Sequence, residues 1–489
     1  MSEEQKQEKK KPHHLKKFFK WFSLSINLLL ITLLLIFQAP WKIIAFFIIL
    51  SLGCFILPKP ARKWFWLSVG AAVLILLIWI FLPEDDTGWR PYTFDKELAA
   101  LEAKYAVPDE ENAALDYYEI FKNADIDSNV PKFFRRTSPS SITDAWFSQD
   151  HPETAEWLKG HQDTIAKLIQ VSQKEKCLFP FITDPVTQNE NMEFLAKIRR
   201  CVFLLIASAN NDIAEGQTDD ALEKYICILQ IADHLYQQPI LIYHLMGAVE
   251  SLSLEKLNRF VIENQPTEDQ LRLISSSIKN LQNSWGEDLR NILDFEKLYV
   301  KNQFGSMVYE INPQGKTRCS RNSLSSSLGI NQSQEYQRRK CAKLGVILEW
   351  FYVPSSPEKI GDIVDSCCKK NYAMTRPDFN WNTQSDELHS RFKLNYGYTV
   401  EFMTDLTYST YYQIHERYLR YLSLRRGSRL LTGIKQYNIE NGKWPNSLDD
   451  IESLVPAEAI IDPAGGKFDY ENHGERFSLY GKLINIWPQ

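Results

Sequence analysis

The residues most able to do chemistry in this chain include two histidines near a helix boundary. His234 and His244 flank Pro239, and Glu250 follows further along. A metal site would require these side chains to converge, yet the chain has no H-E-x-x-H or equivalent spacing. We therefore expect ordinary packing or surface histidines and predict no metal site.

Carboxylates form a second group of candidates. Glu287, Asp288, Asp294 and Glu296 are close enough in sequence to supply a carboxylate pair for acid–base work. Carboxylates at this density are more typical of a solvated helix face. The chain shows no G-x-S-x-G motif, no S-x-x-K in a convincing context and no glycine-rich phosphate loop. Catalytic residues stay unknown at this point, and we predict no cofactor.

A basic strip lies near the C-terminal third. His415 and Glu416 stand among five arginines, which are Arg417, Arg420, Arg425, Arg426 and Arg429. Such a strip could meet lipid phosphates or an acidic partner. A charged helix face is the commoner explanation. The net charge of −5 indicates that nucleic acid is not the main partner.

Eight cysteines are spread along the chain without C-x-x-C or zinc-type spacing. Cys201 and Cys227 fall at apolar helical positions, which predicts small buried hydrophobes. We interpret the adjacent Cys367 and Cys368 as structural rather than redox-active. Disulfides become possible if the body lies outside the cytoplasm, although their pairing cannot be deduced.

The elements that must position these residues are mostly helices. Periodicity and helix-end signals predict helices at about 112–123, 152–174, 190–214, 219–236, 239–262, from 268 onward, and 386–441. Gly216 breaks one helix, and Asp219 or Asp220 is expected to cap the next. This region resembles one tetratricopeptide-type hairpin, but no second copy appears at that family's period. A generic helical hairpin is the favoured interpretation.

Three apolar runs precede this helical body and predict membrane spans, and they are uncharged apart from Lys42, which lies at the interface if the second span begins at Trp41. They cover about 21–37, 41–57 and 65–82, close to the length that crosses a bilayer. A signal peptide is the competing interpretation of the first run. It is disfavoured because the basic region before it is long and no small-residue cleavage pattern follows. The run interiors carry no ionisable residue, which indicates an anchor rather than a transporter.

Lysine and arginine positions set the orientation. Six lysines precede the first run between Lys9 and Lys20, and Lys59, Arg62 and Lys63 follow the second, whereas the chain turns acidic after the third. Positive loops stay in the cytoplasm, so three spans with the body outside satisfy every loop. Two spans would leave the body inside and the 59–63 cluster misplaced. We expect an inner-membrane protein with residues 84–489 extracytoplasmic and the lipid bilayer as one partner.

The C-terminal segment has a recognisable order of motifs. A helix ends at Asn441-Gly442, then Trp444-Pro445 leads to a capping-box-like Ser447 and Asp450. The stretch 462–466 predicts a turn, and 468–470 and 477–479 alternate as a hairpin would.

This order resembles the soluble end of major pseudopilins of type II secretion, over roughly the last 65 residues, and the whole chain is similar to uncharacterised membrane-anchored bacterial envelope proteins. The pseudopilin methylated helix and processing site are missing before Leu430, and the acidic calcium loop does not follow Tyr480. We therefore carry over neither filament assembly nor calcium.

Together these features predict a mainly α protein with N-terminal transmembrane helices, a helical soluble body and a small C-terminal α/β unit with a β-hairpin. The expected divisions are a basic cytoplasmic tail at 1–20, spans within 21–82, a helical domain at 84–310, a polar loop or linker at 311–339, a helical region at 340–429 and the pseudopilin-like unit at 430–489. The expected function is a membrane-anchored interaction or scaffold protein of the bacterial cell envelope, whose partners are other envelope proteins. The alternative is an envelope hydrolase with an unrecognised active site.

Overall fold

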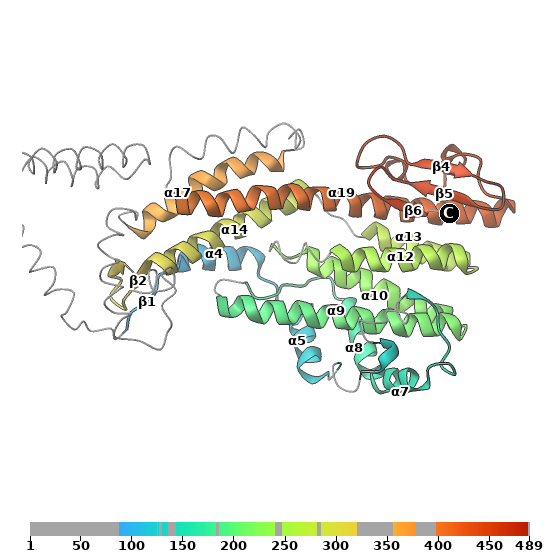
Figure 1. The fold of residues 1–489 in the computed structure, drawn as a ribbon, viewed down its shortest axis with the longest axis horizontal. Helices are drawn as coiled ribbons and strands as arrows, with labels where there is room; N and C mark the ends of the chain where they lie inside the picture. The colour runs from blue at the N-terminus through green and yellow to red at the C-terminus, as the bar shows by residue number, and fades with distance from the viewer. Residues whose placement is uncertain are drawn as a thin grey trace, which may run out of the picture. The chain divides into compact units, whose positions relative to one another are not determined.

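The structure is a computed structural model that describes residues 88–124, 126, 130–134, 143–181, 185–239, 247–280, 285–319, 356–376 and 398–487. Within these ranges the chain is mainly helical, with a small C-terminal sheet, as predicted (Figure 1). The predicted spans at 21–37, 41–57 and 65–82 lie outside the described residues. Among the helices that are described, none combines the length and apolar character needed to cross a bilayer.

Two compact units divide the chain: Met1–Thr93 with Phe304–Gly361, and Phe94–Gln303 with Asp362–Gln489. In the first unit, β1 (Arg90–Pro91), β2 (Tyr309–Ile311) and β3 (Thr317–Cys319) form an antiparallel sheet in that order. The Asn312 carboxamide oxygen accepts the Gln314 and Lys316 amides, which closes the β2–β3 turn. The predicted polar loop at 311–339 therefore begins with a hairpin, and its part beyond 319 is not described.

The second unit holds most of the described helices. They are α4 (Asp95–Tyr105), α5 (Ala113–Asn123), α7 (Pro152–Gly160), α8 (Gln162–Ser172), α9 (Pro185–Ala214), α10 (Thr218–Tyr236), α12 (Gly247–Glu263), α13 (Glu268–Asn280) and α19 (Tyr398–Asn441). Helices α14 (Trp285–Val308) and α17 (Pro357–Asn371) continue across the division between the two units. Short 3₁₀ turns η2, η3, η4 and η5 cover Lys132–Phe134, Tyr372–Thr375, Leu448–Ile451 and Ala457–Ala459.

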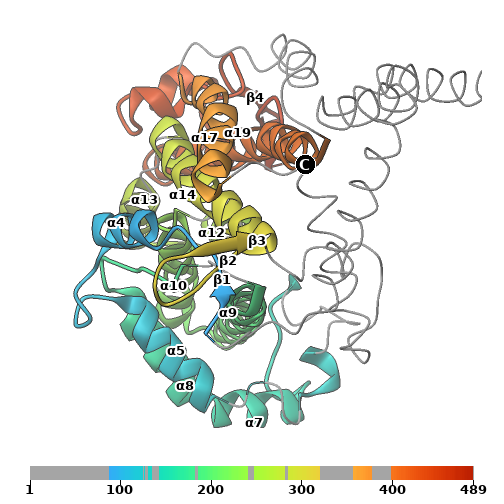
Figure 2. The ribbon, with the colours of Figure 1, turned by 90° about the vertical axis from the view of Figure 1, so that its left-hand side faces the viewer.

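Helix α10 lies at the centre of the core of this unit. It packs against α8, α9, α12 and α13 (Figure 2). An apolar stripe at helical spacing is buried along it, formed by Leu222, Tyr225, Leu229, Ala232 and Leu235. Residues off that stripe, including Ile226, Cys227 and Ile228, are also buried because neighbours cover several faces of the helix. Helix α12 packs in turn against α19, which joins the N-terminal helices to the C-terminal segment.

Several helix limits differ from the sequence prediction. The helix expected over 152–174 is two helices, because the chain bends at His161, whose Nδ1 contacts the Trp157 carbonyl oxygen at 2.8 Å. The residue at the N-cap of α10 is Gln217, not Asp219 or Asp220. Gly216 has a φ of 80° and turns the chain immediately before Gln217, so the helix begins at Thr218. The two aspartates instead occupy the first turn, where negative charge favours the helix. Helix α12 begins at Gly247, and 240–246 are not described.

The C-terminal segment matches its predicted local structure closely. Ser447 and Asp450 form the expected capping box at η4, and the Asp462 carbonyl accepts the Gly465 amide in the predicted turn. Strands β4 (Asp469–Asn472) and β5 (Phe477–Tyr480) form the predicted hairpin, and β6 (Asn485–Trp487) extends the sheet in the order β4-β5-β6. Strand β6 was not predicted from the sequence. Helix α19 runs through position 430 without a break.

The motifs quoted for this segment have structural roles. The Trp444 indole packs on Phe477 with ring centroids 4.7 Å apart, and the Pro445 carbonyl accepts hydrogen bonds from Tyr470 and Asn472. Asp462 is buried, and its carboxylate accepts hydrogen bonds from Ser423 of α19 at 2.6 Å and from the Lys482 amide. These contacts fix the small sheet onto α19.

Candidate functional site

The structure accounts for His234 as a core residue. It is 2% exposed, with Nε2 2.7 Å from the Lys174 carbonyl oxygen and Nδ1 3.0 Å from the Tyr117 hydroxyl. Because a carbonyl can only accept, Nε2 carries the proton and Nδ1 accepts from tyrosine. Burial lowers the pKa of His234, which keeps the ring neutral. His244 lies outside the described residues.

Glu250 is likewise committed to the core rather than to a metal. It is fully buried on α12 and forms an ion pair with Arg425 of α19, whose Nη2 is 3.0 Å from Oε2. The Tyr236 hydroxyl donates to the same oxygen at 2.9 Å. Among the described residues, no group of three or more His, Cys, Asp or Glu side chains is placed to hold a metal ion.

The four acidic candidates on α14 do not act as one cluster. Asp294 accepts a hydrogen bond from the Tyr372 hydroxyl and pairs with Lys104 at 3.4 Å. Burial raises the pKa of Glu296 to about 7. Burial, assisted by the negative charge of Glu287, raises the pKa of Asp288 to about 7 as well. The helix therefore carries two carboxyl groups that titrate near neutral pH.

This titration predicts a pH dependence of stability. Both carboxyls have folded-state pKa values above their usual values near 4, so their contribution is complete below about pH 4 and disappears as the pH rises through about 7. The free energy of unfolding of the Asp288→Asn/Glu296→Gln variant is compared with that of the wild type at each pH. The difference is expected to favour the variant more at pH 8 than at pH 4, by on the order of 1–3 kcal/mol. Denaturant unfolding across this range measures it, with the exposed Glu153→Gln as control. Parallel curves for the double variant and the wild type would show the assignment to be wrong.

The predicted basic strip is divided among separate contacts. Arg425 is buried against Glu250, and Arg429 lies 3.6 Å from Glu458. Arg426 donates to the Ile461 carbonyl at 2.9 Å, and Arg420 faces Glu416 at 3.9 Å. Burial lowers the pKa of His415 to about 4. Arg425, Arg426 and Arg429 are thus engaged within the protein, whereas Arg417 and Arg420 are exposed.

The predicted burial of Cys201 and Cys227 is confirmed. Cys177 is also buried, and burial raises the pKa of Cys177 and Cys227, the latter to about 12. Cys177, Cys201, Cys227 and Cys368 take part in no disulfide. The side chain of Cys367 is not described. High thiol pKa values make the buried cysteines poor nucleophiles.

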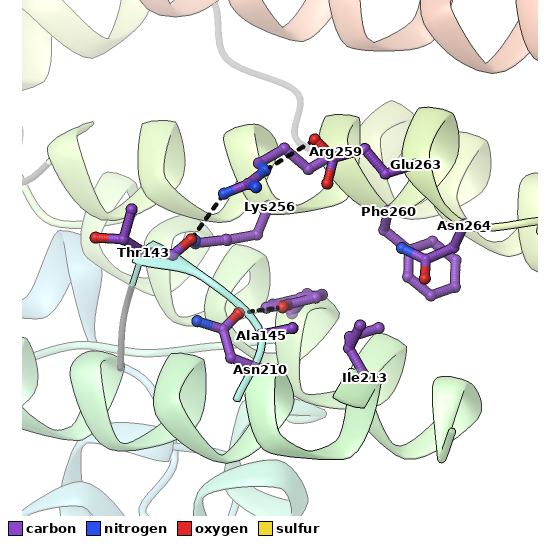
Figure 3. Close-up of a pocket in the computed structure, with 10 residues that line it drawn as sticks. Thr143, Ala145, Asn210, Ile213, Lys256, Arg259, Phe260, Glu263 and Asn264 are labelled. Atoms are coloured by element: carbon purple, nitrogen blue, oxygen red, sulfur yellow. Dashed lines mark hydrogen bonds and ion pairs between the residues drawn. The ribbon is translucent and has the colours of Figure 1, made fainter. Parts of the chain in front are cut away.

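The structure adds a small hollow that the sequence did not predict, which we call the lysine pocket. It has a volume of about 80 Å³ and lies between α9, α10, α12 and the segment that begins at Thr143 (Figure 3). Its lining residues are Thr143, Ala145, Asn210, Ile213, Tyr225, Lys256, Arg259, Phe260, Glu263 and Asn264.

Lys256 is the most unusual side chain of this pocket. It is only 6% exposed, and its ammonium donates to the Thr143 carbonyl, which also accepts from Arg259 Nη1 at 2.7 Å (Figure 3). Asp144 and Glu263 pair with Arg259, each at 3.2 Å, and among the described residues no carboxylate pairs with Lys256. Burial lowers the pKa of Lys256 to about 8, and the charge of Arg259 adds to this effect.

The remaining walls of the lysine pocket are held by neutral hydrogen bonds. Tyr225 of α10 donates to the Asn210 side chain at 2.7 Å, and burial raises the pKa of this tyrosine, so it stays protonated. The Trp146 indole donates to the Ala207 carbonyl at 3.1 Å, which fixes the segment at the mouth of the pocket against α9. The donors around the hollow are thus held by three helices and one anchored segment.

A larger hollow, which we call the groove, adjoins the lysine pocket. Its volume is about 500 Å³, and it lies between α12, α19 and the edge strand β6. Arg259 and Glu263 line both hollows and form the ridge between them. The remaining lining residues of the groove are Ser251, Glu255, Asn258, Leu424, Ile484, Asn485, Ile486 and Trp487.

The sequence indicates a charged helix face at part of this site, but it does not indicate that this face lines a pocket. Glu255, Arg259 and Glu263 are spaced four residues apart, the usual pattern of a charged helix face. From its residue type alone, Lys256 would be predicted to lie on the same solvated helix face. Only the packing of α9 and the Thr143 segment over α12 buries Lys256, and those elements lie far away in sequence.

Comparison of the chain with protein-family models, with curated proteins and with solved structures finds no match.

Proposed function

We propose that this chain is a membrane-anchored interaction protein of the bacterial cell envelope and that its extracytoplasmic helical body binds a partner protein in the groove. The anchor is inferred from the apolar runs within 21–82, and the compartment from the lysine and arginine distribution around them. The pseudopilin-like order of motifs in the last residues is consistent with envelope assembly.

The groove is the observation that carries this proposal. One side presents apolar groups, including Leu424, Ile486 and Trp487, while α12 presents Ser251 and Glu255. An apolar floor beside a polar rim is the usual composition of a protein interface. At about 500 Å³, the groove accommodates several side chains of a partner.

The strand beside the groove favours an extended occupant. β6 pairs only with β5 among the described strands, so its other edge is available for strand addition. Arg259 is already paired with Glu263, whereas Glu255 is exposed, which favours a basic residue on the partner segment. The occupant that fits is an extended, apolar segment with one basic residue.

The hydrolase alternative receives less support from the two hollows. Among the described residues no histidine lines either hollow, and Glu263, the carboxylate of the lysine pocket, is engaged with Arg259. A convergent His, Asp or Glu set is the feature that a hydrolytic site would require.

Site-specific photo-crosslinking of the full chain in membranes tests the proposal. A photoreactive residue at Glu255 or Asn485, both in the groove, is expected to give one discrete protein adduct. The same probe at Asp269 on α13, which is 92% exposed, should not. Ser251→Trp, which fills the groove, should remove the adduct, and Ser276→Trp on the exposed face of α13 should leave it.

Two results would overturn the proposal. One is an adduct that survives Ser251→Trp, and the other is the same adduct formed from Asp269. An alkaline phosphatase fusion after Gln489 is the control for compartment and is expected to be active. An inactive fusion would remove the extracytoplasmic assignment while leaving the groove open to a cytoplasmic partner.

A further inference from the structure

We propose that the lysine pocket binds the carboxylate of a ligand that carries this group on a short apolar stem. This inference goes beyond the proposed function and does not depend on it, because the groove and the lysine pocket are separate hollows that share only a ridge.

The first reason is the missing counter-charge of Lys256. A buried ammonium is costly unless it is paired with an anion, yet Lys256 is 6% exposed and forms no ion pair among the described residues. An ammonium has three donors, and one of them is used by the Thr143 carbonyl. Within the described part of the chain, the other two donors have no acceptor and can serve a bound carboxylate.

Arg259 supplies a second donor set at the same wall. Its Nη1 contacts the Thr143 carbonyl and Asp144, and its Nε contacts Glu263. Among the described residues Nη2 has no hydrogen-bond acceptor, so this nitrogen is available to a ligand. Figure 3 shows Lys256 and Arg259 extending from α12 on the same side of the hollow.

The shape and the remaining walls select the ligand class. A volume of about 80 Å³ holds a carboxylate with a stem of two or three carbons, or a few waters. Ala145, Ile213 and Phe260 line the hollow with apolar groups that suit such a stem. A phosphate presents oxygens on all sides, and those facing the apolar walls would lack donors.

The competing explanation is that Lys256 only anchors the Thr143 segment. Arg259 holds the same carbonyl, so a variant that removes the ammonium leaves this anchor in place. Lys256→Met keeps the length of the side chain and removes only its charge and donors. The exposed Lys167→Met on α8 is the matched control, since Lys167 pairs with Asp163 far from the pocket in sequence.

Calorimetric titration of the full chain in detergent micelles with propionate provides the test. We expect saturable binding at pH 7, a loss of affinity of at least tenfold in Lys256→Met and Arg259→Gln, and no change in Lys167→Met. Chloride and phosphate at equal ionic strength should not compete. If a glutamate-containing peptide binds more tightly than propionate, the carboxylate belongs to a partner protein. If propionate binds more tightly, the carboxylate belongs to a free small ligand.

The affinity is also expected to fall as the pH rises through about 8, because Lys256 must be protonated. The charged groups that act on it are Arg259, Glu255, Glu263 and Asp144, and the facing tyrosine, Tyr225, stays protonated. In the wild type labelled with ¹³C-lysine, with the amine left unmodified, the Lys256 Cε resonance should report a titration near this pH that shifts upward with propionate. This measurement decides the matter even if Lys256→Met fails to fold.

No binding of either carboxylate, or equal affinity in the wild type and Lys256→Met, would overturn the inference. The partner adduct at the groove is expected to persist in Lys256→Met, so the two proposals fail independently.

Discussion

Arg425→Met is expected to lower the free energy of unfolding by about 3–5 kcal/mol, because it leaves a fully buried carboxylate without its partner. Glu250 has no exposed surface, and Arg425 is 6% exposed. The Tyr236 hydroxyl alone cannot replace the charge that the guanidinium supplies. Burial is the largest single effect and lowers the pKa of Arg425, but the charge and the hydrogen bond of Glu250, together with Tyr236 and Tyr418, outweigh it and raise this pKa.

The loss extends to other acidic groups near the pair. The positive charge of Arg425 lowers the pKa of Asp233 and Asp288, although burial is the larger effect and raises both. Without Arg425 these carboxyls are even harder to ionise, so the variant should be least stable above pH 7.

Denaturant unfolding of the full chain, monitored by helical circular dichroism, measures the cost. Arg420→Met is the control, because Arg420 is exposed and its ion pair with Glu416 is long, at 3.9 Å. We expect this variant to change the free energy of unfolding by less than about 0.5 kcal/mol. Glu250→Leu/Arg425→Met should recover most of the loss, since neither charge remains buried. If the single variant matched Arg420→Met in stability, the pair would not hold α12 to α19.

Gly427→Val is expected to destabilise the contact between α19 and the small sheet by about 3 kcal/mol, at the upper end of overpacking effects. A Cβ at Gly427 would lie 2.5, 2.7 and 2.8 Å from three side-chain carbons of Ile486. Ile486 is 5% exposed and sits in β6, so the strand itself must move away. The gain from replacing a helical glycine is only about 1 kcal/mol and does not offset this clash.

The double variant Gly427→Val/Ile486→Ala should relieve the clash, because the side-chain volume added at position 427 is removed at position 486. Gly160→Ala at the end of α7 is the matched control, because nothing lies within 4 Å of its added Cβ. Thermal unfolding compares the wild type, the two single variants, the double variant and Gly160→Ala. Additive effects of Gly427→Val and Ile486→Ala would contradict the direct contact.

This contact also matters for the proposed function. Ile486 lines the groove, and displacement of β6 would change both the apolar floor and the available strand edge. The yield of the partner adduct formed from the photoreactive residue at Glu255 should therefore fall in Gly427→Val. It should recover in the double variant Gly427→Val/Ile486→Ala. Glycine at position 427 thus leaves the space that Ile486 of β6 occupies against α19.

Sequence was most informative where structure is local. The Ser447–Asp450 capping box, the turn after Asp462 and the β4–β5 hairpin follow from short-range rules for caps, turns and alternation. The apolar stripe of α10 marked its core face for the same reason. The bend at His161 was missed, although its contact with the Trp157 carbonyl is also local, because helical periodicity continues across it.

The amino-acid sequence by itself determined the helical class, the Ser447–Asp450 capping box and the β4–β5 hairpin, because each depends on residues that are close together in the chain. Tertiary structure alone decided that Glu250 meets Arg425, that β6 borders a groove and that Lys256 is buried. These outcomes depend on segments far apart in sequence, and a charged residue gives no sign of whether a distant helix will cover it. Burial is what converts Lys256 from a solvated helix residue into a candidate ligand-binding group.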